Sequence, residues 1–153
     1  MADSALVQIS IRGADAAIIN NQVYAALIQP PNATTWIATP IGDGTIRFTD
    51  QASGLILGTP DTDPGTQAYV TTPGSGAAIT SWTVRQYSDD IEDDPVAITD
   101  PTQLTSGYYS LQAPGTGEYL YRNQIEDYSL IPKRIALQPP GLDQGPLIIQ
   151  VVG

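Results

Sequence analysis

One segment recurs along the chain, and this recurrence restricts the possible folds more than any other feature of the sequence. The copies read TTWIATPIG (34–42), TSWTVRQYS (80–88) and GPLIIQVVG (145–153). In register they place Trp36, Trp82 and Leu147 in one column, and a large apolar residue at the same place in every copy indicates a core position. A unit this short cannot bury its own apolar face, so the copies must close around one common core.

The same series of short apolar runs precedes each copy. The runs are LVQISI, AAIIN and VYAALIQPP in the first repeat, TIRFTD, GLILGTP and TQAYVTTP in the second, and GYYSLQA, EYLYRN and RIALQPP in the third. Runs of this length, rich in β-branched and aromatic residues and bounded by Gly, Pro and Asn, are typical of strands. The spacing of an amphipathic helix is not sustained anywhere for several turns.

Twelve short strands in three four-strand units predict an all-β chain with the β-trefoil fold, a barrel capped by hairpins around a pseudo-threefold axis. A propeller would need more blades than the chain supplies, and a sandwich has no reason for threefold recurrence. We expect one domain over 1–153, with repeats at about 5–42, 44–88 and 107–153. The column of large residues should then lie in the core and not stack on a ligand.

Residues 88–106 interrupt the repeats. This stretch between the second and third repeats is acidic and contains Pro95 and Pro101. Because runs of like charge are usually solvated, the segment is predicted to be a linker or a long surface loop, with an acidic binding arm as the weaker interpretation.

Charge and composition exclude several classes of function. The net charge is -10, with 6 Lys and Arg residues, no histidine and no cysteine. A phosphate backbone requires clustered basic side chains, so no nucleic acid partner is expected. Ser–His–Asp and Cys–His sites cannot be assembled, and zinc loses its usual ligands. We therefore expect no enzyme activity, no metal and no cofactor.

Other short motifs have structural interpretations. The start MADSALVQIS lacks a basic stretch followed by a long apolar one, and no apolar run approaches the length of a membrane span, so a cytoplasmic protein without a membrane partner is expected. The stretch DTDPG (61–65) is predicted to be a turn, because Thr66 and Thr72 stand where a calcium loop needs Gly and Glu. The acids of 89–94 are not expected to hold the fixed geometry that a catalytic carboxylate pair needs.

The stretch RNQIEDYSLIPKR (122–134) concentrates charge between two predicted strands. Its three cations, Arg122, Lys133 and Arg134, are half of the 6 in the chain. A charged excursion of this kind between the strand-like segments GEYLY and IALQPP is predicted to be a surface loop or hairpin.

This loop and its flanks resemble the opening repeat of the cysteine-free β-trefoil serine protease inhibitors of mushrooms, the cospin-like family. The family pattern runs G-x-Y-x-I/L, then G-R-N-x-x-E-D-R-S-L-x-P-K-x-V. The positions that fit are Arg122, Asn123, Glu126, Asp127, Ser129, Leu130, Pro132 and Lys133. The resemblance is strong across 107–141 and fainter in ADAAIINNQVYAALIQPPNATTWIA and GTQAYVTTP, which look like the second and third repeats of the family. It implies an inhibitor whose partner is a trypsin- or chymotrypsin-like serine protease.

The order of repeats departs from the family. The repeat that opens the family sequence comes last here, so the chain looks circularly permuted by one repeat. The stretch 88–106 would then bridge the two termini of the family. The closeness of chain ends in compact domains makes such a permutation feasible.

The residue expected to enter the protease pocket also differs. Where the family has arginine in E-D-R-S, this chain has Tyr128. A trypsin pocket holds a buried aspartate that demands a cation, whereas a chymotrypsin pocket is an apolar slot. The resemblance thus implies inhibitor architecture with affinity for trypsin lost or redirected, unless Lys133 or Arg134 is the presented cation. Asn123, Glu126, Asp127 and Pro132 either brace the loop or form an ordinary turn network.

Two alternatives to inhibition stay open. Lectins share the predicted fold, and fold alone does not determine function. The Q-x-W signature of ricin-type repeats is missing, but Tyr24, Tyr69 and Tyr119 are candidates for contact with a glycan. The other alternative is a permuted scaffold whose inhibitory loop has been altered and now serves another interaction.

Overall fold

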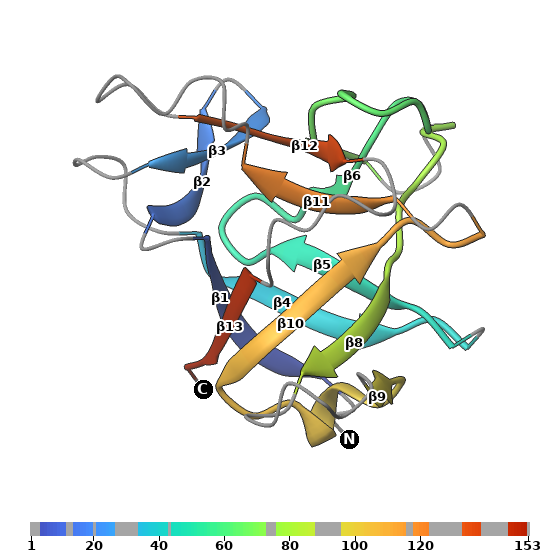
Figure 1. Ribbon diagram of the computed structural model, residues 1–153. Coiled ribbons are helices and arrows are strands. Elements are labelled where there is room, and N and C mark those ends of the chain that lie inside the picture. The colour runs from blue at the N-terminus through green and yellow to red at the C-terminus, as the bar shows by residue number, and fades with distance from the viewer. Residues whose placement is uncertain are drawn as a thin grey trace.

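The computed structural model describes residues 4–11, 14–19, 21–26, 34–42, 44–72, 76–87, 96–115, 118–122, 133–138 and 147–152. These residues form an all-β protein of 13 strands with a β-barrel (Figure 1). The sequence predicted this all-β class. The strands are β1 (Ala5–Ile11), β2 (Ala14–Ile19), β3 (Gln22–Ala26), β4 (Trp36–Pro40), β5 (Ile46–Asp50), β6 (Ile56–Gly58), β7 (Tyr69–Thr71), β8 (Thr83–Tyr87), β9 (Val96–Ile98), β10 (Gly107–Gln112), β11 (Tyr119–Arg122), β12 (Lys133–Gln138) and β13 (Leu147–Val151), with a 3-10 turn, η1 (Pro101–Gln103). None of the described residues forms a helix long and apolar enough to cross a membrane.

The barrel is a closed ring of antiparallel strands. β1 pairs with β4, β4 with β5, β8 with β10, β10 with β13, and β13 returns to β1. The remaining contact joins β5 to the residue just before β8, as a bridge in which Ile46 and Trp82 exchange two backbone hydrogen bonds of 2.9 Å. The bridge joins the two ends of the strand series, so the described barrel strands leave less edge exposed to pairing with another chain than an open sheet would.

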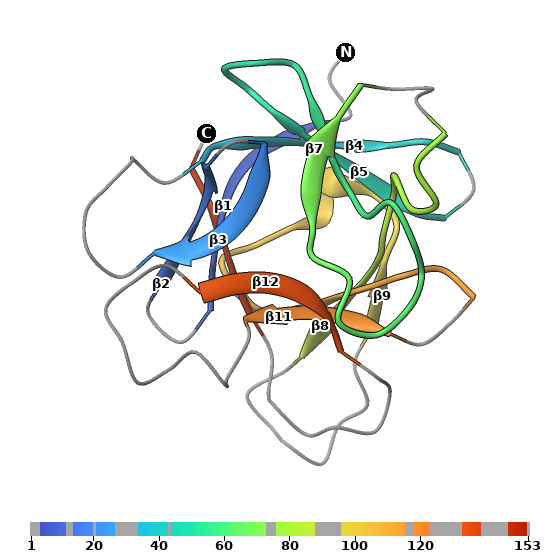
Figure 2. The ribbon, with the colours of Figure 1, turned by 90° about the horizontal axis from the view of Figure 1, so that it is seen from above.

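Hairpins cover one end of this barrel. β2 pairs with β3, β6 with β7, and β11 with β12. Viewed from above in Figure 2, β3, β7 and β12 surround a common centre. They are joined directly, since β3 pairs with both β7 and β12, and Gln67 bridges Ala136. Three hairpins from distant parts of the chain therefore form one cap.

The recurring column of large residues lies in the core, as predicted. Trp36 and Trp82 are 0% exposed and Leu147 is 2% exposed. Each is paired with an apolar residue of a barrel strand that precedes it in the sequence, β1, β5 or β10. The pairs are Val7–Trp36, Ile46–Trp82 and Tyr109–Leu147. Residues with this burial would lose their packing if they turned outward to hold a ligand, so they stabilise the barrel.

The segment predicted to be an acidic linker or surface loop is in part a folded element. Its second half forms β9, which pairs with β8, and η1, which packs beside β4. Ile98, Pro101 and Leu104 are buried there. β9 lies at the end of the barrel away from the hairpins (Figure 1). The prediction was based on the acidic residues of this segment. The apolar residues among them have enough surface to make burial against the end of the barrel favourable. Residues 88–95 lie outside the described residues.

Two side chains hold this segment in place. The Tyr109 hydroxyl donates to the carbonyl oxygen of Thr105 at 2.6 Å and accepts from the Thr105 N–H at 3.0 Å. Asp100 caps η1, because its Oδ1 accepts from the Thr102 hydroxyl at 2.7 Å and from the Thr102 N–H at 3.0 Å. The hydroxyl bond first, and the N–H bond second, hold the pKa of Asp100 below its usual value of 3.8.

Candidate functional site

The predicted binding loop begins and ends on two neighbouring strands. β11 and β12 are antiparallel, and among the described residues the pair nearest the loop is Arg122 with Ile135. β11 and β12 therefore form a hairpin around this stretch, which is one of the two alternatives that the sequence predicted. Of the predicted site residues, Arg122 is the last of β11 and Lys133 is the first of β12, whereas Asn123, Glu126, Asp127, Tyr128, Ser129 and Leu130, together with Pro132, lie outside the described residues.

Lys133 and Arg134 belong to a strand. Their backbones pair with Ala25 and Tyr24 of β3. The two candidate cations are therefore the first residues of β12, and their main chain is part of the sheet.

The foot of the hairpin is firmly packed. Leu120 and Tyr121 of β11, and Ile135 and Leu137 of β12, are all buried. Buried apolar side chains on both strands resist separation of the two loop ends, because separation would return that surface to water. The two strands that flank residues 123–132 are thus held together by their buried side chains.

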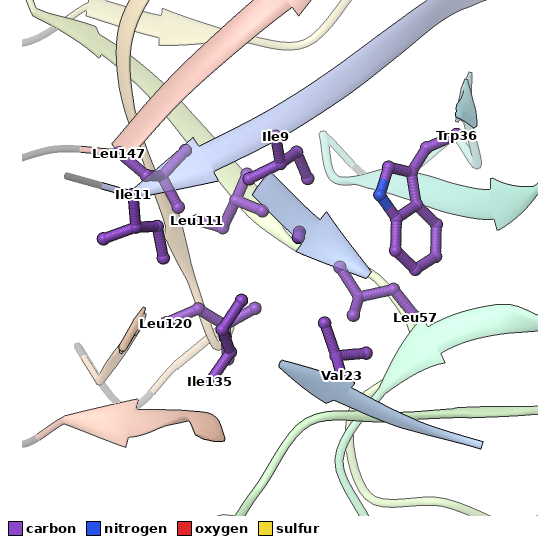
Figure 3. Close-up of a pocket in the computed structure, with 10 residues that line it drawn as sticks. Ile9, Ile11, Val23, Trp36, Leu57, Leu111, Leu120, Ile135 and Leu147 are labelled. Carbon is purple, nitrogen blue, oxygen red and sulfur yellow. The ribbon is translucent and has the colours of Figure 1, made fainter. Parts of the chain in front are cut away.

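A small cavity lies beneath these two strands, between the cap and the barrel. Its volume is about 10 Å³, and Figure 3 shows Leu120 and Ile135 on the side opposite Trp36. Such a space is at the lower limit for one water molecule and its lining is apolar, so it is not a small-molecule site.

One of the residues that line the cavity from the hairpins is small. Ala16, Leu57 and Leu120 line it from β2, β6 and β11, each opposite a buried residue of its own hairpin partner. Two of these positions carry leucine and the third carries alanine. Ala16 therefore fills less of this space than the two leucines do.

The three tyrosines that were candidates for a glycan site are not brought together. Tyr24 and Tyr69 lie on adjoining strands, because Tyr69 is the pairing partner of Gln22 and Tyr24 follows two positions later on the same face. Both are half-buried, and the Tyr24 hydroxyl donates to Gln22 Oε1 at 3.4 Å. Tyr119 lies on β11 and packs against the core, so it belongs to a different surface. Gln22 was missed from the sequence, because only the pairing places it between the tyrosines.

The stretch DTDPG is a turn, as predicted. Asp61 Oδ1 accepts from the N–H of Thr62 at 2.7 Å and of Asp63 at 3.4 Å, which uses the carboxylate within the turn. Within the described part of the chain, no three or more His, Cys, Asp or Glu residues are placed to hold a metal ion.

The closed barrel with a cap of hairpins defines the class of this protein, an all-β chain on a β-trefoil scaffold. No family model matches the sequence, and no curated protein matches it. Among solved structures it is similar to ThreeFoil, a designed 3-fold symmetric protein, with a TM-score of 0.65 and 19% identity over 97% of this chain and 98% of that one. At this identity the likeness concerns the fold alone.

Proposed function

We propose that the protein is a serine protease inhibitor that presents residues 122–134 to the protease active site as a substrate-like loop. One observation carries this proposal. The dense sequence motif of 122–134 falls on the connection between β11 and β12, the hairpin with a buried base. Because the strand ends on either side of residues 123–132 are already held together, a partner need not order those ends when it binds.

The preference for one class of protease follows from Tyr128, which takes the place of the arginine in the family pattern. Tyr128 offers an aromatic ring, which suits the apolar slot of a chymotrypsin-like pocket. In a trypsin-like pocket the same ring would leave a buried carboxylate without its cation, which costs about 1–3 kcal/mol or more. The preferred partner is therefore a chymotrypsin-like protease.

In the same proposal the chain is a β-trefoil of three four-strand repeats, permuted by one repeat relative to the cospin-like inhibitors. Two pairings support a permutation. β13 pairs with β1, and β8 pairs with β10, so chain ends placed at either position would lie on neighbouring strands. Moving the ends from one position to the other leaves the barrel pairings unchanged.

Inhibition titrations against trypsin and chymotrypsin test the function. We expect the wild-type protein to inhibit chymotrypsin, and Tyr128→Arg to inhibit trypsin at least about tenfold more strongly than the wild type, since a cation then meets the pocket carboxylate. Tyr108→Arg is the matched control, because Tyr108 is an exposed tyrosine of the barrel wall on β10. It should leave both titrations unchanged.

Two results would contradict the proposal. If the wild type inhibits neither protease and Tyr128→Arg does not inhibit trypsin, then residues 122–134 are not an inhibitory loop. If the wild type inhibits trypsin, the contact passes to Lys133, Arg134 or another loop, and Tyr128 has no role in specificity.

A second candidate function is glycan binding, favoured by the arrangement of Tyr24, Gln22 and Tyr69 on one outer face of the cap. Aromatic rings can cover the apolar face of a sugar, while an exposed amide bonds its hydroxyl groups. A glycan array with the wild type and with Tyr69→Ala separates the candidates. Binding that Tyr69→Ala abolishes, combined with no protease inhibition, would replace the inhibitor proposal.

A further inference from the structure

The strand that follows the proposed inhibitory loop is hydrogen-bonded along both of its edges. One edge of β12 pairs with β11, and the first residues of the other edge pair with β3. The rest of that second edge is occupied by residues 65–68, a segment outside the named strands. Gly65 N–H donates to Leu137 O at 2.7 Å, Leu137 N–H donates to Thr66 O at 2.9 Å, and Ala68 N–H donates to Ile135 O at 2.8 Å.

Residues 65–68 are also bonded to β3. The Val23 N–H donates to the carbonyl oxygen of Ala68 at 3.0 Å, and Gln67 Nε2 donates to the Val23 carbonyl oxygen at 3.2 Å. Ala68 is 0% exposed. Its N–H bonds to β12 and its carbonyl oxygen to β3, so this residue connects the two strands. Because Ala68 and Val23 are buried, breaking the bond between them leaves an unsatisfied group and is costly.

The segment has its own reasons to keep this shape. Gly65 has φ of +91°, a conformation that a residue with a Cβ rarely adopts. Directly after it, the Thr66 N–H and hydroxyl both donate to the Asp63 carbonyl oxygen, at 3.1 and 2.7 Å. Pro64 limits the chain on the other side of Gly65. The backbone of 65–68 is therefore set locally before it meets β12.

We propose that residues 65–68 are the support that positions the 122–134 loop, with Gly65 and Ala68 as positioning residues. This inference rests on the proposed function for its consequence, but its physical content is independent. A β12 strand pinned on both edges keeps the C-terminal foot of the loop in one place relative to Arg122. The loop then enters a protease cleft without the entropy cost of ordering its base.

The test compares two glycine substitutions that impose the same kind of strain. Gly65→Ala places a Cβ at φ of +91°, and the matched control Gly54→Ala places one at +79° in the connection between β5 and β6. At both positions the new Cβ meets no atom within 4 Å, so neither variant introduces a clash. The strain should lower the melting temperature of both by similar amounts.

Only Gly65→Ala should disturb β12. We expect the amide proton of Leu137 to exchange about tenfold faster in Gly65→Ala than in Gly54→Ala, because local opening frees it from Thr66. With chymotrypsin, we expect the dissociation constant to rise about tenfold for Gly65→Ala and to stay near the wild-type value for Gly54→Ala.

The two readouts separate failure of the support from failure of the function. Equal exchange of the Leu137 amide in both variants would overturn the support, whatever the protease result. Faster exchange in Gly65→Ala with an unchanged dissociation constant would show that the support exists but does not position the loop. If the wild type inhibits neither protease, the positioning role falls together with the proposed function, and amide exchange still decides whether residues 65–68 pin the strand.

Discussion

Replacing Gly58 with alanine is expected to lower the free energy of unfolding by about 3 kcal/mol or more. Gly58 ends β6 and faces Tyr69 across the hairpin. A Cβ built on it would overlap the carbonyl oxygen of Ile79 and come within 3.4 Å of the carbonyl carbon. These are backbone atoms, so no side chain can rotate out of the way.

The surrounding hydrogen bonds prevent easy relief of this clash. Thr59 and Ile79 exchange two backbone bonds, of 3.0 and 3.1 Å, immediately beside Gly58. Moving Ile79 away from a new Cβ would stretch both bonds at a buried position, since Thr59 is 0% exposed. The substitution must therefore either overpack the site or break the bridge, and each is costly.

Urea unfolding measures this effect, with Gly107→Ala as the control. Gly107 is also a strand glycine without a positive φ, but a Cβ on it meets nothing within 4 Å. The control should stay within about 0.5 kcal/mol of the wild type. Equal stability of the two variants would mean that the approach of Ile79 to Gly58 does not constrain this position.

The second large effect is expected at Trp82. Its indole Nε1 donates to the Leu57 carbonyl oxygen at 3.2 Å inside the core, whereas Trp36 Nε1 is buried without a hydrogen-bond partner among the described residues. Trp82→Phe should cost about 3 kcal/mol, from lost packing and from the hydrogen bond withdrawn from Leu57. Trp36→Phe should cost about 1–2 kcal/mol less, because it removes a similar apolar volume together with a donor that bonds to none of these residues.

The same unfolding experiment decides this prediction. Both tryptophans are 0% exposed, so a difference between the variants reports the hydrogen bond and not the burial. Losses of equal size would indicate that the Trp82–Leu57 bond contributes nothing net to stability. A larger loss for Trp36→Phe would contradict the assignment of the unpartnered indole.

The apolar pattern of the sequence was sufficient to predict the all-β class and the core column of Trp36, Trp82 and Leu147. Strand alternation and the residues at chain reversals are local properties, and they do not depend on which strands finally meet. The turn at 61–65 was predictable for the same reason. For the candidate loop, the sequence was sufficient to predict that it lies between two strands and which side chains it carries.

Only the tertiary structure decided which distant segments share hydrogen bonds. The hydrogen bonds between β12 and residues 65–68, the close approach of Ile79 to Gly58 and the burial of Ile98 and Leu104 all bring together parts of the chain that are distant in sequence. The local sequence patterns of these parts do not indicate their partners. A backbone N–H has the same chemistry in every residue, so its partner is selected only when the three hairpins and the barrel close together. The sequence by itself determines what each segment can bury, and closure of the barrel and cap determines which segments meet.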